Sequence, residues 1–183
     1  MINYGNEYVL IENIREENIS KCVEARRINQ SSFFGKRVSD AESEQWIRLH
    51  SESPNNILLE IIYRPLDFFV GTIGFVIQND EIEIGRLSVY SPAIKELVRM
   101  GVDPKQLHKV VEAAGKLSID YLFDKTDAKL LFCNVFADNR YSNSLCVQLG
   151  GIPKKIQQEI EGVSMDVLRY EITRAEYLAR GKK

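Results

Sequence analysis

The stretch FCNVFADNRYSNSLCVQLGG (132–151) decides the fold. It contains the end of an almost continuous apolar run, AKLLFCNVF (128–136), and then a short helical segment that a glycine pair closes. Apolar runs without alternation are typical of strands covered on both faces, and glycine is favoured just after a helix. The stretch therefore predicts a buried strand with a helix directly after it.

The segment before this strand is predicted to be a long helix. In KQLHKVVEAAGKLSIDYLF (105–123), apolar residues recur at helical spacing. Asp103 is suited to cap its first turn, and Pro104 is suited to an early helical position. A helix, a buried strand and a second helix together predict an α-β-α unit that packs against a sheet.

Three strands precede that unit and predict an antiparallel meander. They read NNILLEIIY (55–63), FFVGTIGFVIQ (68–78) and EIEIGRLSVY (81–90). Gly71, Gly74 and Gly85 lie inside them, where glycine is typical of a bulge or of a close approach between backbones. The segment after residue 90, with Pro92 and Gly101, is interpreted as a connection.

The remaining segments complete a single predicted domain, residues 1–183. They are a strand over 7–14, a helix over 17–28, a helix that Asp40 caps, a hairpin over 152–172 around Glu161-Gly162, and a last helix within 173–183. This element order predicts an α/β fold with a mixed sheet and one crossover helix beside its central strands.

Composition narrows the class of function. Apolar residues make up 44% of the 183 residues, charged residues 27%, and the net charge is −2. Such a charge argues against nucleic acid or an anionic membrane as a partner. Cys22, Cys133 and Cys146 show no paired spacing, and neither a signal peptide nor a membrane span is indicated. We therefore expect a cytoplasmic protein that acts on small molecules or proteins.

The commoner catalytic motifs are absent from the sequence. It contains no GxSxG elbow, no GxxxxGK[ST] phosphate loop and no GxGxxG fingerprint. His50 and His108 are the only histidines, and neither has a partner at metal-ligand spacing. No metal site is predicted.

Three strings together resemble the GNAT superfamily of N-acetyltransferases. They are VGTIGF with EIEIGRLSV (70–75 and 81–89), the stretch 132–151, and VSMDVLRYEITRAEYL (163–178). The family segment N-x-x-[AS]-x-x-[LV]-x-x-x-x-G-F is matched by Asn139, Ser142, Leu145 and Gly150, with Gly151 in place of Phe. The chain looks most like the branch of ribosomal-protein and nucleotide-sugar amine N-acetyltransferases. The resemblance implies a mostly antiparallel central sheet with one parallel strand pair splayed apart for coenzyme A.

The resemblance also implies where acetyl-CoA binds. Its pantetheine arm would lie between strands 81–90 and 128–137, and a backbone N–H near Leu87, Ser88 or Val89 would polarise the acetyl carbonyl. Asn139 and Ser142 would contact the same arm, although Asn139 could equally be a helix N-cap.

The phosphates would lie at the start of the 105–123 helix. The family's loop there reads [QR]-x-x-G-x-[GA], whereas this chain keeps Gln106 and has neither glycine. His108 and Lys109 would then contribute side chains to the phosphate site. The alternative is that the loop 99–102 holds the phosphates.

Two residues are candidates for proton transfer. Glu83 matches the acidic position of the family and would deprotonate the amine, although it could also be a solvated strand residue. Cys146 lies where many members have a tyrosine that protonates the coenzyme A thiolate. Core packing is the alternative for Cys146.

The acceptor would be held by the loop 29–37, through Asn29, Phe33, Phe34 and Arg37. Arg86 would orient a phosphate of the acceptor or cover the sheet edge.

The function implied is acetyl transfer from acetyl-CoA to the primary amine of a small molecule, such as a nucleotide-linked amino sugar. The alternatives are acetylation of a protein N-terminus and a catalytically silent relative that binds coenzyme A weakly or not at all. A homodimer through an exposed strand is also expected.

Overall fold

The computed structural model describes residues 2–32, 38–160 and 162–181. Within them lies one eight-stranded sheet with the order β1-β2-β3-β4-β5-β6-β8-β7. The strands are β1 (Asn3–Gly5), β2 (Val9–Asn13), β3 (Asn56–Tyr63), β4 (Phe68–Gln78), β5 (Glu81–Val89), β6 (Leu130–Phe136), β7 (Ile152–Ile160) and β8 (Val163–Thr173). The helices are α1 (Ile19–Ile28), α2 (Asp40–Ser51), α3 (Ser91–Arg99), α4 (Pro104–Lys125), α5 (Arg140–Gln148) and α6 (Arg174–Arg180), with short 3₁₀ turns η1 (Glu16–Asn18), η2 (Gln30–Ser32) and η3 (Arg64–Leu66).

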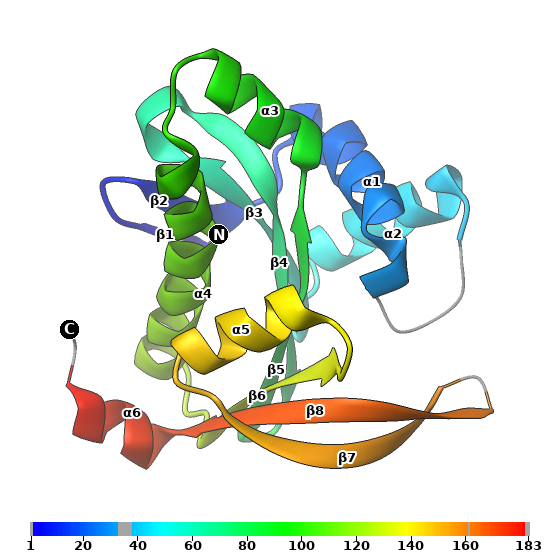
Figure 1. Cartoon of the computed structure of the whole chain (residues 1–183), viewed down its shortest axis with the longest axis vertical. Coiled ribbons are helices and arrows are strands. Elements are labelled where there is room, and N and C mark those ends of the chain that lie inside the picture. The colour runs from blue at the N-terminus through cyan, green and yellow to red at the C-terminus, as the bar shows by residue number, and fades with distance from the viewer. Residues whose placement is uncertain (1, 33–37, 161, 182–183) are drawn as a thin grey trace.

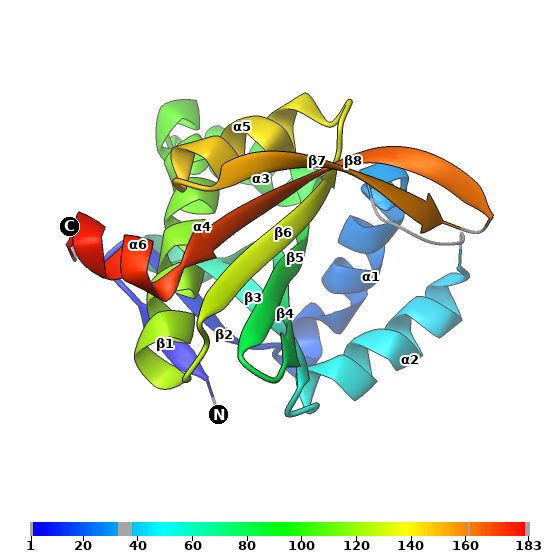
Figure 2. The ribbon, with the colours of Figure 1, turned by 90° about the horizontal axis from the view of Figure 1, so that it is seen from below.

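Helices cover both faces of this sheet (Figure 1). On the α4 face, apolar residues of α4, such as Val110 and Leu122, pack in one core with inward residues of the strands, such as Ile61, Ile73 and Ile82. On the α1–α2 face, a second cluster joins the helices to β3 and β4 through Val23, Ile47, Leu58, Ile62 and Phe69. Figure 2 shows α1 and α2 on the opposite side of the strands from α4.

The predicted sheet is confirmed. β3, β4 and β5 form the antiparallel meander, and β5 and β6 are the parallel pair. The glycine pair closes α5 as predicted, because Gly150 has φ of +87° and the N–H of Gly151 donates to the carbonyl of Cys146 at 2.9 Å.

Three features differ from prediction. The strand β1 (Asn3–Gly5), which pairs with β2, was not predicted. The connection after β5 contains the helix α3, because Pro92 occupies its first turn, where a missing N–H costs nothing, and Ala93 and Leu97 are buried. The cap assigned to Asp40 is wrong by one residue. Ser39 is the N-cap, and it exchanges hydrogen bonds with Glu42 in a capping box. Of the hairpin turn, Glu161 lies outside the described residues.

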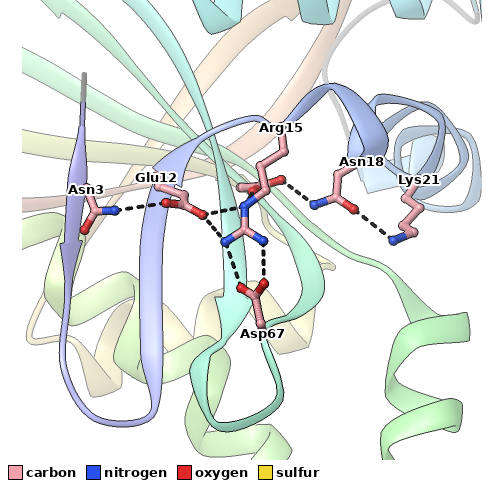
Figure 3. Close-up of polar contacts among 7 residues, drawn as sticks. Asn3, Glu12, Arg15, Asn18, Lys21 and Asp67 are labelled. Carbon is pink, nitrogen blue, oxygen red and sulfur yellow. Dashed lines mark hydrogen bonds and ion pairs between the residues drawn. The ribbon is translucent and has the colours of Figure 1, made fainter.

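A network centred on Arg15 ties the first strands to the start of α1 (Figure 3). The guanidinium donates to both carboxylate oxygens of Asp67 at 2.8 Å and through Nε to Glu12 at 2.8 Å. The same Nε lies 3.2 Å from Oε1 of Glu60, whose other oxygen accepts from Asn18 at 2.9 Å. Glu60 is fully buried, and this burial raises its pKa to about 7. The network therefore contains a carboxyl group whose charge changes near neutral pH.

The titration of Glu60 predicts a pH dependence of stability. Between the ordinary pKa of 4.5 and the folded value of about 7, the unfolded chain has lost the proton that the folded chain keeps. The free energy of unfolding must then fall as pH rises through this range, and level off above it. Glu60→Gln has no such proton. Its stability relative to the wild type should improve by up to about 3 kcal/mol from pH 5 to pH 7.5.

Urea unfolding at several pH values measures this difference. Glu7→Gln, a change at an exposed residue, is the matched control and should follow the wild-type curve. Parallel curves for Glu60→Gln and the wild type would show that Glu60 does not titrate as described.

Candidate active site

The candidate site lies where β5 and β6 separate. The two strands pair only from Glu81 to Glu83 and from Leu130 to Phe132. Beyond this point β6 continues to pair with β8 as far as Phe136, while β5 diverges. A cleft of about 620 Å³ opens beside the end of β5, between α3, the first turns of α4 and the start of α5. The cleft adjoins the slot predicted between these strands, although none of its described lining residues comes from β6.

A bulge in β5 accompanies the divergence. Between the pairs Thr72–Ser88 and Gly74–Gly85, β5 has two residues where β4 has one. Arg86 adopts φ of +53°, a left-handed conformation that costs a non-glycine residue about 1–2 kcal/mol. Gly74 makes room for it, since a Cβ there would lie 3.0 Å from Cδ of Arg86. The glycines predicted to mark a bulge thus include one beside it.

Six of the predicted binding residues line this cleft. They are Leu87, Val89, His108, Asn139 and Ser142 of the predicted coenzyme A site, and Asn29 of the predicted acceptor site. Asn139 also caps α5, because its side chain accepts from the N–H of Ser142 at 3.2 Å.

Asn29 closes one end of the cleft. Its Nδ2 donates to Oγ of Ser88 at 3.1 Å and to the carbonyl of Val89 at 2.9 Å. This side chain therefore fastens the end of α1 to the end of β5.

Three predicted residues lie elsewhere. Ser88 is buried on the α1–α2 face, where it bonds Asn29. Gln106 is exposed and does not line the cleft. Lys109 lines a separate groove of about 740 Å³ between α4, α5 and α6. Phe33, Phe34 and Arg37 lie outside the described residues.

The backbone offers little to a phosphate at the start of α4. The carboxylate of Asp103 accepts from the N–H of Lys105 at 2.8 Å, and Pro104 has no N–H. The alternative loop 99–102 ends α3, and its Gly101 and Val102 N–H groups donate back to carbonyls of that helix at 3.0 Å. Basic side chains at the cleft, from Lys95 and His108, are what remains for an anion.

Glu83 lies at the apex of the slot, on the face opposite α4. Its neighbour Ile82 is buried in the α4-face core, and side chains alternate along a strand. Nδ2 of Asn134, on β6, lies 3.5 Å from Oε1 of Glu83 across the gap. The carboxylate is thus directed toward the α1–α2 face.

Two arginines stack on one indole ring on that face. The guanidinium carbons of Arg26 and Arg86 lie 4.2 and 5.2 Å from the ring centre of Trp46. Burial lowers the pKa of both arginines, so each remains a cation with little water around it. The carboxylate of Glu83 interacts electrostatically with Arg86 and opposes part of the effect of burial on its pKa. This surface therefore favours an anionic group.

Cys146 meets a second thiol on the α4 side of the slot. Both Cys146 and Cys133 line a small apolar cavity of about 80 Å³ beneath the slot. The neighbouring thiol of Cys133 lowers the pKa of Cys146. The nearby thiol of Cys146, together with burial, raises the pKa of Cys133 well above its usual value.

Several residues of this site were not predicted from sequence. Arg26 is on α1 and Trp46 is on α2. Asn134 is on β6, the strand next to that of Glu83, and Cys133 is on β6 whereas Cys146 is on α5. Only Asn134 had a usable signal, since it stands two residues after Phe132 at the splayed end of β6.

Three further predictions concern a metal site, a membrane span and a homodimer. In the described part of the chain, no group of three or more His, Cys, Asp or Glu side chains could hold a metal ion. None of the described helices is long and apolar enough to cross a membrane. β7 is at the end of the strand order, with β8 as its partner there. The homodimer stays a prediction.

No protein-family model and no curated protein matches the sequence. Solved structures match the fold. An acetyltransferase of the GNAT family from Bacillus anthracis is 12% identical with a TM-score of 0.74, covering 96% of this chain and 100% of that one. Ribosomal-protein-S5-alanine acetyltransferase from Vibrio fischeri is 13% identical with a TM-score of 0.67, covering 97% and 99%. A spermidine N-acetyltransferase variant from Vibrio cholerae is 14% identical with a TM-score of 0.70, covering 97% and 100%.

These likenesses identify the class of structure. The chain has the GNAT fold, as its sequence motifs predicted.

Proposed function

We propose that this protein is an acetyl-CoA-dependent N-acetyltransferase that acts on the primary amine of a small molecule carrying an anionic group. The observation that supports it most is the early separation of β5 from β6, with a cleft along the freed part of β5. Such a cleft suits an extended thiol-bearing arm, which can pair with strand backbone as an added strand does.

The fit to acetyl-CoA differs between its two ends. The pantetheine arm fits between Leu87 and Val89 on one side and Asn139 and Ser142 on the other. The backbone N–H groups of Gly101, Val102 and Lys105 already have partners, so Lys95 and His108 would hold the phosphates through side chains. Binding that relies on exposed charges weakens with salt.

The two proton-transfer candidates stand on opposite faces of the sheet at the slot apex. Acetyl-CoA supplies an activated acyl group and a thiolate leaving group. Glu83, facing α1 and α2, would take a proton from the acceptor's ammonium so that a neutral amine attacks. Cys146, facing α4, would return a proton to the departing thiolate. This separation suits a transfer in which acceptor and coenzyme enter from different sides.

The acceptor class is inferred from Arg26 and Arg86. Two poorly hydrated guanidinium groups beside Trp46 would bind a phosphate or carboxylate. A nucleotide-linked amino sugar carries such a group. A protein N-terminus is the second candidate. The occupied N–H groups at Asp103 favour the third, a relative that does not bind coenzyme A.

Acetyl-CoA binding tests the proposal first. At about 100 times its dissociation constant, a ligand should stabilise the fold by about 2.7 kcal/mol, seen as a rise in melting temperature. The rise should shrink as salt is added, because the phosphates rely on Lys95 and His108. Unchanged melting at millimolar acetyl-CoA in low salt would refute acetyl transfer and support the silent relative.

Glu83→Gln should lower kcat by about 10²- to 10⁴-fold and leave acetyl-CoA binding unchanged, since the amide cannot accept the proton. Release of free coenzyme A thiol measures turnover. Glu81→Gln is the matched control, because Glu81 lies on the same strand and face but two residues further from the bulge. Equal turnover by Glu83→Gln and the wild type would remove Glu83 from the role of base.

Arg86→Gln should raise KM for a nucleotide-linked amino sugar by about tenfold or more, since a charge-assisted hydrogen bond is worth roughly 1.5–3 kcal/mol. KM for the same amino sugar without phosphates should change little. Arg99→Gln, on an exposed arginine of α3, is the control. An equal rise in KM for both acceptors would argue against an anion site at Arg86.

A further inference from the structure

The thiol pair beneath the slot is the part of the molecule that acetyl transfer does not explain. Cys133 projects from β6 and Cys146 from α5, and they meet in the apolar cavity that Gly85 and Leu87 also line. A single proton donor at this place would need only Cys146. Both side chains are unbridged and partly exposed.

The sulfur of Cys146 is suited to act as a nucleophile, and the sulfur of Cys133 is suited to be its resolving partner. Cys133 and Cys146 line the same cavity, where the nearby Cys133 thiol lowers the pKa of Cys146 and Cys133 itself stays protonated at neutral pH. Sγ of Cys133 lies 3.9 Å from the carbonyl oxygen of Asn134. The thiolate is the form that reacts with peroxides, and a neighbouring thiol then resolves the product. Cys22 offers a contrast, because burial raises its pKa and it lies in the core on the opposite face of the sheet.

We propose that Cys133 and Cys146 form an oxidisable dithiol that hydrogen peroxide converts to an intramolecular disulfide. The thiolate of Cys146 attacks one peroxide oxygen, the O–O bond breaks, and Cys146 becomes a sulfenic acid as hydroxide leaves and is protonated to water. The sulfur of Cys133 then attacks the sulfur of Cys146, the S–OH bond breaks, and the proton of Cys133 leaves with the hydroxyl group as a second water. The two thiols together lose two electrons, and the peroxide gains them.

The disulfide would change the slot in two ways. It would join β6 to the end of the second turn of α5 across the cavity, which removes the room for a thiol at the apex. It would also remove the thiol proton that Cys146 contributes to acetyl transfer. The disulfide should therefore weaken acetyl-CoA binding and acetyl transfer. This effect rests on the proposed function, whereas the formation of the disulfide does not.

The full chain treated with hydrogen peroxide tests the proposal. After unfolding and treatment with a maleimide, the reduced protein should take a label at all three cysteines and the oxidised protein at Cys22 only. The oxidised chain should be lighter than the reduced one by two hydrogen atoms. Trypsin should release the segments 130–140 and 141–154 joined together, and dithiothreitol should separate them.

Three substitutions sharpen the result. Cys22→Ser should form the disulfide as the wild type does. Cys133→Ser should let Cys146 proceed to sulfinic acid, because no partner intercepts the sulfenic acid. Cys146→Ser should leave Cys133 unoxidised at the same peroxide concentration. Thermal melting of each variant confirms that it is folded.

Other outcomes would overturn the proposal. Sulfinic acid on Cys146 of the wild-type chain without the joined segments would exclude a resolving role for Cys133. A disulfide between two chains, or one that includes Cys22, would exclude the pairing. If the joined segments form but oxidation leaves the affinity for acetyl-CoA unchanged, the inferred effect of the disulfide on the slot is wrong. A reduced protein that never binds acetyl-CoA would refute the proposed function alone.

Discussion

The parallel pairing of β5 with β6 ends after three residues, and the position of every candidate residue depends on where it ends. A continuous parallel ladder would bury the backbone of both strands. The bulge at Arg86 turns β5 away, and β6 remains held by β8 along its whole length. The strain of a left-handed arginine is tolerated because Gly74 clears space opposite and Trp46 stacks with the side chain. The separation of the two strands is therefore built into the sheet, and the helices α3, α4 and α5 complete the cleft beside it.

The same divergence assigns the two faces different chemistry. Toward α4 the apex is apolar and carries the thiols Cys133 and Cys146. Toward α1 and α2 it carries a carboxylate, an amide and two cations. Strand alternation alone places Glu83 and its buried neighbours on opposite sides. A reaction that joins two ligands across the sheet uses both surfaces. A redox change at the thiols would affect this reaction from the α4 surface.

Much of the fold followed from sequence because its strands and α4 are strongly periodic, so β4 was predicted with its observed bounds. The helix α3 was not predicted, since Pro92 is compatible with either a loop or a first turn. The missing glycines near Gln106 pointed to an altered phosphate site, but the cap by Asp103 needed the structure. The pairing of Cys133 with Cys146 could not be predicted, because it depends on how α5 docks on β6. The spacing of the two cysteines along the chain does not predict that contact.

Amide hydrogen exchange with and without acetyl-CoA tests most directly whether the separated strands hold the coenzyme. Backbone amides in 84–89 of β5, and in 133–142 from β6 into α5, should exchange more slowly when acetyl-CoA is bound. Those in 152–160 of the edge strand should not change. Protection confined to the groove lined by Lys116 and Arg180, with the β5 amides unaffected, would contradict the assignment of the slot.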